Sequence, residues 1–331
     1  MRNPDGKLLE VEGNPIPPGG ESGLVETPDG KLLRYAIWPP AKDSRKGTVC
    51  VFEGRGEFIE KYFETVGDIL DRGYGVAIFD WRGQGGSGVK GRKFFERHVA
   101  SFDEYDEDLT TFMLDVVLPD CPPPYHAIAH STGGLPLVLG LVRRHWFERV
   151  ILTAPLFSLA STTIPWKLVH FLVGLLSAVG FGGFALPGRS ARSFAATSFF
   201  SNGFTSDEER FNRTKKIMRA APYMTSKRPK IGWLNAAFSA MSKIRALPKA
   251  SDLRAPVLVV SSRRDCVVSI DEAEAFANRI ANATNIVIDG AQHEILLERD
   301  ELREQFWAAF ESFFEGTQSS SKTGKQKDRA A

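Results

Sequence analysis

Charge of one sign, paired cysteines and long apolar runs are all scarce in this sequence. The 331 residues carry 42 Lys and Arg against 40 Asp and Glu, a net charge of +2. No strong field therefore attracts polyanions, and we expect no nucleic-acid partner. The apolar stretch at 171–186 contains four glycines and falls short of the ~20 residues that span a bilayer. A membrane-spanning helix is thus not expected.

The cysteines and the N-terminal residues indicate the cellular compartment and whether the protein binds a metal. Cys50, Cys121 and Cys266 are odd in number and widely spaced, which argues against a disulfide framework and a zinc site. Residues 1–20 are polar and rich in proline and glycine, without the apolar core of a secretory signal. We expect a cytoplasmic protein that needs no metal and no cofactor, and association with a membrane stays open.

Short apolar runs alternate with helical patterns along most of the chain. The alternation predicts βαβ units and a mostly parallel sheet flanked by helices, an α/β fold. The hexapeptide PDGKLL occurs at 4–9 and 28–33, and each copy predicts a D-G turn that enters a strand. Six further strands are expected at 47–52, 74–79, 125–129, 149–154, 256–261 and 285–288.

The alternation of strand and helix patterns stops between the strands expected at 149–154 and 256–261, and this interruption divides the chain into parts. Residues 1–155 and 251–315 are expected to form the core, 156–250 an inserted, mainly helical cap, and 316–331 a disordered tail. Within the cap, 171–186 predicts a buried helix followed by a glycine-rich turn. The alternatives for this stretch are an apolar wall for an acyl chain and a surface that contacts lipid.

Residues 125–134 carry the strongest chemical signal. A short strand runs into the sequence HSTGG and then into a helical pattern, which is the context of a nucleophile elbow. The sharp turn needs small residues two before and two after the nucleophile, and Ala129 and Gly133 flank Ser131 in this way. The first of these positions is usually glycine. A glycine-rich turn with Ser131 as a helix N-cap is the structural alternative.

A nucleophilic serine needs a base and an orienting acid further along the chain. Of six histidines, only His293 lies after the last expected strands, and its loop belongs at the carboxyl edge of the sheet, where Ser131 also emerges. Asp265 follows the preceding strand, one βα step earlier, and is favoured as the acid. Its rivals are Asp252 before that strand, Asp271 at a helix start, and Asp289 on the loop of the base.

The oxyanion that forms in acyl transfer needs preorganised N–H donors. One donor is expected from the backbone of Thr132, directly after the nucleophile. The other is expected from the backbone of Arg55, in the turn of VFEGRGE. The sequence FDWRGQGGSG lacks the spacing of a phosphate-binding loop, so Asp80 and Arg82 are expected to brace loops near the site.

In order and spacing, these motifs resemble those of the α/β-hydrolase superfamily. The chain is similar to its lysophospholipase and monoacylglycerol-lipase-like group, also labelled serine aminopeptidases. The resemblance covers about 14–314 and rests on DGKLLRYAIW, EGRGEFIEKY, FDWRGQGGSG, AHSTGG, FTSDEERF, RRDCVV and GAQHE. It implies the same triad and the same two oxyanion donors. Two residues depart from the pattern: Glu53, where relatives often have histidine, and Ala129 in the elbow.

The expected reaction is hydrolysis of a carboxylic ester through an acyl-enzyme. Because the cap is rich in Phe and Leu and holds Trp166 and Trp233, a monoacyl lipid is the leading substrate, with peripheral membrane contact through the cap as an open alternative. An aminopeptidase would need carboxylates for a substrate ammonium, for which the candidates are Asp207, Glu208 and Glu209. A non-catalytic binding protein that kept the fold is the third alternative.

Overall fold

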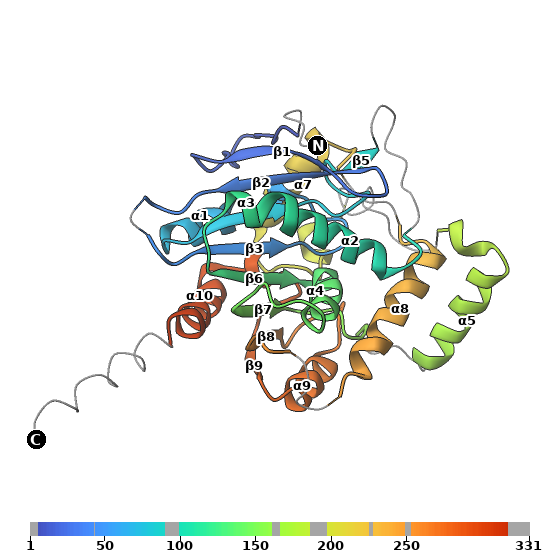
Figure 1. Ribbon diagram of the computed structural model, residues 1–331. Helices are drawn as coiled ribbons and strands as arrows, with labels where there is room; N and C mark the ends of the chain where they lie inside the picture. Colours follow the sequence, from blue (N-terminus) through green and yellow to red (C-terminus); the bar gives the residue numbers. More distant parts are fainter. Residues whose placement is uncertain are drawn as a thin grey trace, which may run out of the picture.

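A mixed sheet in the order β1-β2-β4-β3-β6-β7-β8-β9 runs through the centre of the protein (Figure 1). The computed structural model describes residues 6–42, 44–89, 99–160, 166–185, 197–224, 228–248 and 253–316. From β4 to β9 all neighbours are parallel, whereas β2 is antiparallel to β1, β4 and the short β5. The strands are β1 (Glu21–Glu26), β2 (Lys31–Trp38), β3 (Thr48–Phe52), β4 (Gly75–Phe79), β5 (Gly88–Val89), β6 (Tyr125–His130), β7 (Arg149–Thr153), β8 (Val257–Ser262) and β9 (Ala283–Ile288).

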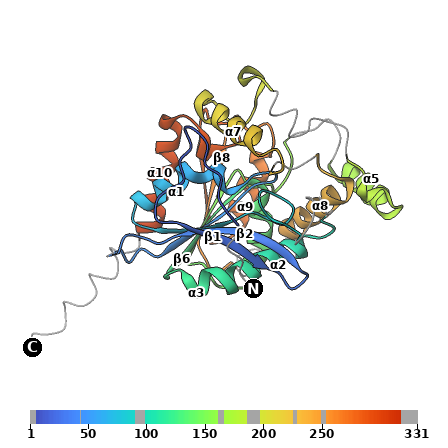
Figure 2. The same ribbon diagram turned by 90° about the horizontal axis from the view of Figure 1, so that it is seen from above.

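The predicted α/β fold is confirmed, and each of the six strands expected after residue 46 is present with ends within two residues of the expectation. Every residue of β3, β4 and β8 is buried, as a parallel sheet covered on both faces requires. Figure 2 shows α2 (Phe102–Phe112) and α3 (Leu118–Asp120) on one side of the sheet, and α1 (Phe63–Asp71) and α10 (Asp300–Glu315) on the other. The remaining core helices are α4 (Gly134–Leu141) and α9 (Ile270–Arg279).

The two copies of PDGKLL have different structures. In the second copy, Thr27 N donates to Lys31 O at 2.8 Å and Gly30 has φ 76°, so a turn leads into β2 as predicted. The prediction for the first copy is wrong: its described residues, from position 6 onward, form no strand. Leu9 N instead donates to the Glu60 side chain at 3.0 Å.

The chain between β7 and β8 contains helices α5 (Trp166–Ala178), α7 (Glu208–Ala220) and α8 (Ile231–Arg245), and its described residues include no strand. α8 packs on α4, and α5 packs on α8 and lies outermost (Figures 1 and 2). The predicted helix and glycine turn are present, since Gly180 has φ 93° after α5. The prediction that this helix is buried is wrong. α5 directs a row of large apolar side chains outward, among them Phe171, which is 65% exposed.

Two further expectations concern the C-terminal tail and membrane-spanning helices. Of the predicted disordered tail, residues 317–331 lie outside the described residues. Among the helices that the structure describes, we find none with the length and apolar character needed to cross a membrane.

Candidate active site

Ser131 stands where β6 turns into a 3-10 turn, Ser131–Gly133, and then into α4. Its φ is 50°, in the left-handed region that a non-glycine residue rarely adopts. A Cβ on Gly133 would lie 2.5 Å from the carbonyl oxygen of Glu53 and 2.7 Å from that of Phe52. The elbow therefore requires glycine at position 133, two residues after the serine. Two residues before the serine, the methyl group of Ala129 is accommodated and is fully buried within the sheet.

Three residues from three loops at one edge of the sheet form a hydrogen-bonded chain. His293 Nε2 lies 3.0 Å from Ser131 Oγ, and His293 Nδ1 lies 2.7 Å from Asp265 Oδ2. His293 is 4% exposed and Ser131 is 7% exposed, so water has little access to either group. The structure thus brings together the three residues that the sequence singled out as a triad.

The carboxylate of Asp265 is held in place by its own loop. Its second oxygen, Oδ1, accepts hydrogen bonds from the amides of Val267 at 2.7 Å and Val268 at 2.9 Å. Burial acts to raise the pKa of Asp265, but the hydrogen bond and charge of His293, together with these amides, leave it below its usual value. A charged acid is therefore stable at neutral pH, oriented towards the base.

The rival carboxylates lie elsewhere. Asp271 is in the first turn of α9, where Ser269 is the N-cap. Asp289 is 90% exposed beside Arg263. Asp252 lies outside the described residues. Asp265 is the one of the four that the structure shows in contact with His293.

The turn that contains Arg55 is fixed by side-chain acceptors on both of its flanks. Gly54 N donates to Glu57 Oε2 at 2.5 Å, and Gly56 N donates to Gln84 Oε1 at 2.7 Å. Arg55 lines the same cavity as Ser131 and Thr132, and its guanidinium stacks 4.8 Å above the Trp233 ring. These contacts orient the loop at the edge where an oxyanion would form.

Asp80 and Arg82 brace this region, as expected. Asp80 accepts hydrogen bonds from the amide of Ile59 at 2.9 Å and from Arg34 Nε at 2.6 Å. Arg82 Nε donates to Asp108 at 2.8 Å. Both side chains are buried, and each connects the loop after β4 to a neighbouring element.

Ser131 and His293 open into a cavity of about 810 Å³ between the core and the insertion. Most of its lining is apolar: Phe58, Leu156, Leu159, Phe204, Met218, Trp233, Leu234, Ala237, Met241 and Val267. The carboxylates suggested for an aminopeptidase are not part of this lining. Asp207 caps α7 and pairs with Arg210, and Glu208 and Glu209 are exposed. The side chain of Trp166 lies outside the described part.

A buried polar network in the wall of the cavity was missed by sequence reasoning. Lys61 Nζ donates to Glu57 Oε1 at 2.5 Å and to Glu294 Oε1 at 2.7 Å, and Tyr62 Oη donates to Glu57 Oε2 at 2.6 Å. Burial acts to raise the pKa of Glu57, but Lys61 and His130 lower it to about 2. The one local signal was the i, i+4 spacing of a glutamate and a lysine in EGRGEFIEKY.

Two buried groups beside this network have pKa values that are shifted in favour of their uncharged forms. The ring of His130 lies 4.9 Å from that of His293, and burial together with the charge of His293 outweighs Glu57 and lowers its pKa to about 4. Burial, followed by the charges of Asp80 and Glu57, raises the pKa of Glu53 well above its usual value. Neither oxygen of Glu53 has a hydrogen-bond partner among the described residues, and Glu53 does not line the cavity.

No cluster of three or more histidine, cysteine or acidic side chains with the geometry of a metal site occurs within the described ranges. The sheet order, the elbow and the loop positions of the three contacting side chains define an α/β-hydrolase fold. Residues 43–300 match the family model described as serine aminopeptidase, S33. The chain belongs to this family.

Named relatives are similar to this chain over most of its length, and a solved structure shares its fold. Lysophospholipase L2 of Escherichia coli strain K12 is 28% identical over 282 residues, covering 80% of this chain and 79% of the relative. A probable lysophospholipase L2 of Haemophilus influenzae is 26% identical, covering 82% and 85%. A soluble variant of the monoglyceride lipase of Saccharomyces cerevisiae, solved with a substrate analogue, shares the fold at a TM-score of 0.70 and 19% identity, covering 90% and 96%.

Proposed function

We propose that this protein is a serine hydrolase that cleaves carboxylic esters through an acyl-enzyme. The observation that carries the proposal is the chain from Ser131 Oγ through His293 to Asp265, with distances of 3.0 Å and 2.7 Å, at the base of an apolar cavity. Distances of this size allow proton transfer between nucleophile and base. Membership of a hydrolase family supports the same conclusion.

Each group has a role in this mechanism. His293 Nε2 takes the hydroxyl proton while Ser131 Oγ forms a bond to the substrate carbonyl carbon, and Asp265 stabilises the imidazolium that results. The backbone amides of Arg55 and Thr132 stabilise the oxyanion. When the intermediate collapses, the bond to the leaving alcohol breaks and His293 gives it the proton. Water, activated by the same histidine, then releases the carboxylic acid.

The leading substrate is a monoacyl lipid, either a lysophospholipid or a monoacylglycerol. The cavity is large enough for a fatty acyl chain, and its lining is mostly apolar. The named relatives are lysophospholipases L2. Residues 156–250 would act as the cap that forms much of this wall over a core of 1–155 and 251–315. An aminopeptidase is less well supported, because the cavity carboxylates Glu57 and Glu294 both bind Lys61. Among the described lining residues this leaves no unpaired carboxylate for a substrate ammonium.

The test is hydrolysis of p-nitrophenyl esters of increasing chain length, followed by lysophospholipids and an aminoacyl amide. Wild-type protein should turn over acyl esters, whereas Ser131→Ala should lose activity by roughly 10⁴-fold or more. A fluorophosphonate probe should label the wild type and not Ser131→Ala. Normal turnover in Ser131→Ala would refute the assignment, and the absence of both turnover and labelling in the wild type would favour a non-catalytic binding protein.

The cap also presents a surface suited to a lipid bilayer, the outward face of α5. Its exposed side chains recur at helical spacing and are Leu168, Phe171, Leu172, Leu175 and Leu176. No acidic residue occurs between Glu148 and Asp207, so this stretch of sequence carries only positive charge. Monomeric proteins rarely expose such patches without a binding role, and we propose that α5 rests on anionic membranes, where monoacyl lipids reside.

Sedimentation with vesicles of phosphatidylcholine and phosphatidylglycerol tests this contact. Phe171→Ser combined with Leu175→Ser should weaken binding by about tenfold or more without changing turnover of a short soluble ester. Leu114→Ser, at a 52% exposed leucine outside the cap, is the matched control and should bind like the wild type. Equal binding by all three proteins would rule out α5 as the contact surface.

A further inference from the structure

Three successive cap residues lie against the loop that carries His293. Phe204 O accepts a hydrogen bond from Glu294 N at 2.7 Å, and Thr205 Oγ1 donates to Leu297 O at 2.6 Å. Ser206 donates to Glu298 Oε2 through its amide at 3.0 Å and also through its hydroxyl. These residues come from the sequence FTSDEERF, which the proposed reaction leaves without a role.

The same contacts fix the backbone on both sides of the base. Gln292 N, before His293, donates to Glu298 Oε1 at 2.6 Å. Glu294 N, after His293, donates to the carbonyl of Phe204. Glu298 is completely buried, and its two carboxylate oxygens connect the base loop to the cap. One flank of His293 is therefore held by the cap directly, and the other by a carboxylate that also holds the cap.

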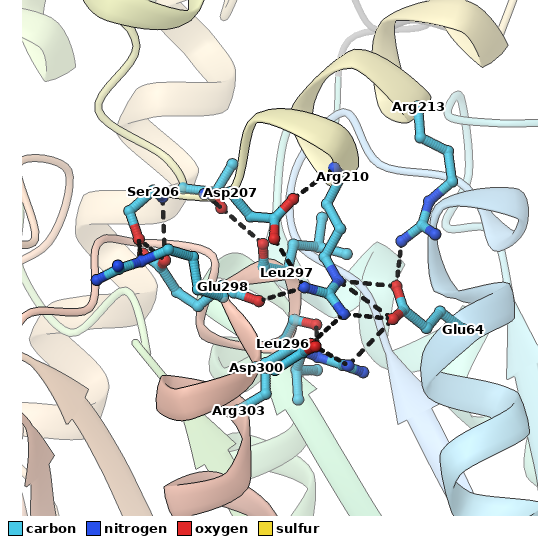
Figure 3. Close-up of polar contacts among 12 residues, drawn as sticks. Glu64, Ser206, Asp207, Arg210, Arg213, Leu296, Leu297, Glu298, Asp300 and Arg303 are labelled. Atoms are coloured by element: carbon cyan, nitrogen blue, oxygen red, sulfur yellow. Dashed lines mark hydrogen bonds and ion pairs between the residues drawn. The ribbon is translucent and has the colours of Figure 1, made fainter. Parts of the chain in front are cut away.

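A larger ion-pair cluster anchors this junction to the core (Figure 3). Arg210 of α7 donates to the Glu298 carbonyl at 3.0 Å, to Glu64 at 2.6 Å and to Asp300 at 2.6 Å. Arg303 of α10 donates to the Leu296 carbonyl at 3.0 Å. The cluster thus joins the cap helix α7 to α1, to α10 and to the base loop within one group of contacts.

We propose that Glu298 and the cap segment 204–206 are positioning residues for His293, so that the base is aligned with Ser131 only while the cap is docked on its loop. The inference rests on the proposed hydrolase function. Its physical reason is that alignment at the reacting atoms is sensitive to small displacements. Losing the shared carboxylate frees Gln292 N and Ser206 together. The loop between β9 and α10 then keeps its contacts with Phe204 and Thr205 but loses the contact that joins the residue before His293 to the cap.

Replacement of Glu298 separates this positioning role from a merely structural one. Glu298→Ala should lower kcat by about 10- to 100-fold while KM stays within about twofold, because the cavity lining is unchanged. Glu298→Gln keeps an acceptor for Gln292 N and should recover most of the lost kcat. Glu304→Ala and Glu304→Gln, at an exposed glutamate on α10, are the matched controls and should leave both constants unchanged.

A second readout requires no substrate. The proton shared between His293 Nδ1 and Asp265 should give a low-field NMR resonance in the wild type and in Glu304→Ala, and this resonance should broaden or disappear in Glu298→Ala. If Glu298→Ala does not fold, Thr205→Val tests the cap side alone, and its kcat should fall by about threefold or more. Thr205→Val removes one hydroxyl at nearly constant volume.

The outcomes distinguish this inference from the proposed function. A folded Glu298→Ala protein with wild-type kcat and resonance would overturn the positioning role, as would a loss confined to KM or a Glu298→Gln protein no better than Glu298→Ala. If Glu298→Ala does not fold, wild-type kcat in Thr205→Val would overturn the role instead. If the wild type hydrolyses no ester yet its resonance disappears in Glu298→Ala, the proposed function fails and the positioning of His293 by Glu298 stands.

Discussion

Adding a single methyl group at Gly133 should damage both the fold and the site. A Cβ there would lie 2.5 Å from the Glu53 carbonyl oxygen and 2.7 Å from the Phe52 carbonyl oxygen. Both oxygens belong to the backbone at the end of β3, which is paired with β4 and β6 and cannot yield as a side chain would. Overpacking of this kind costs about 1–3 kcal/mol, so we expect Gly133→Ala to lower the free energy of unfolding by that amount.

The displacement caused by Gly133→Ala should also lower the reaction rate of Ser131. The strand end that must shift continues into Gly54 and Arg55, and the elbow itself carries Ser131. A shift near 1 Å at reacting groups can reduce turnover by about 100-fold. Urea unfolding and the rate of fluorophosphonate labelling measure the two effects separately. Gly133→Ala should be impaired in both.

A second glycine provides the control for this substitution. A Cβ on Gly67, in α1, would meet nothing within 4 Å, and alanine in a helix interior is more favourable than glycine by about 0.5–1 kcal/mol. Gly67→Ala should therefore be slightly more stable than the wild type and react at the same rate. If Gly133→Ala matched the wild type in stability and labelling, the close approach of β3 to the elbow would not be the constraint we infer.

Two further predictions concern buried charge. Burial and the charge of Arg149 lower the pKa of His126 from 6.5 to about 4. Between these two pH values the unfolded chain binds a proton at His126 and the folded protein does not, so the free energy of unfolding decreases as the pH falls through this range. His126→Phe should reduce the loss of unfolding free energy between pH 7 and pH 5 by about 2 kcal/mol, measured by urea unfolding at both pH values; an unchanged loss would contradict the assignment. Arg34 is buried between Glu60 at 2.6 Å and Asp80 at 2.6 Å, so Arg34→Met should cost about 3–5 kcal/mol by leaving two buried carboxylates without their cation. Arg143→Met, at a half-exposed residue paired with Asp106, should cost less than about 1 kcal/mol, and equal losses in the two variants would refute the distinction.

The parts of the fold and site that the sequence predicts are those set by local patterns. The buried parallel strands are short apolar runs, so their positions could be found to within two residues. The three contacting residues could be ordered because each follows a strand, and the carboxyl ends of parallel strands meet at one edge. Only one histidine lies after the last strands, which made His293 predictable before any distance was known.

The parts that were missed depend on contacts between distant residues or on surfaces without a local signature. Ser206 and Glu298 are 92 positions apart, and no spacing within either segment indicates that they meet. In α5 both faces are apolar, because Val169 and Val173 pack towards the core while Leu172 and Leu175 face outward. Hydrophobic periodicity therefore predicts the helix but does not distinguish a buried helix from one with an exposed apolar face.

In the proposed mechanism the turn around Arg55 and the loop that carries His293 act together, and Lys61 connects them on the core side. Its ammonium binds Glu57, which fixes the turn around Arg55, and it binds Glu294, which follows His293 directly. Because all three side chains are buried or nearly so, neither carboxylate could lose this cation without leaving an unpaired charge in the interior. Lys61 at the cavity wall therefore holds the turn around Arg55 to the loop that carries His293, and Glu298 holds that loop to residues 204–206. If the proposed mechanism is right, Ser131 acts between two loops whose relative position is set on both sides.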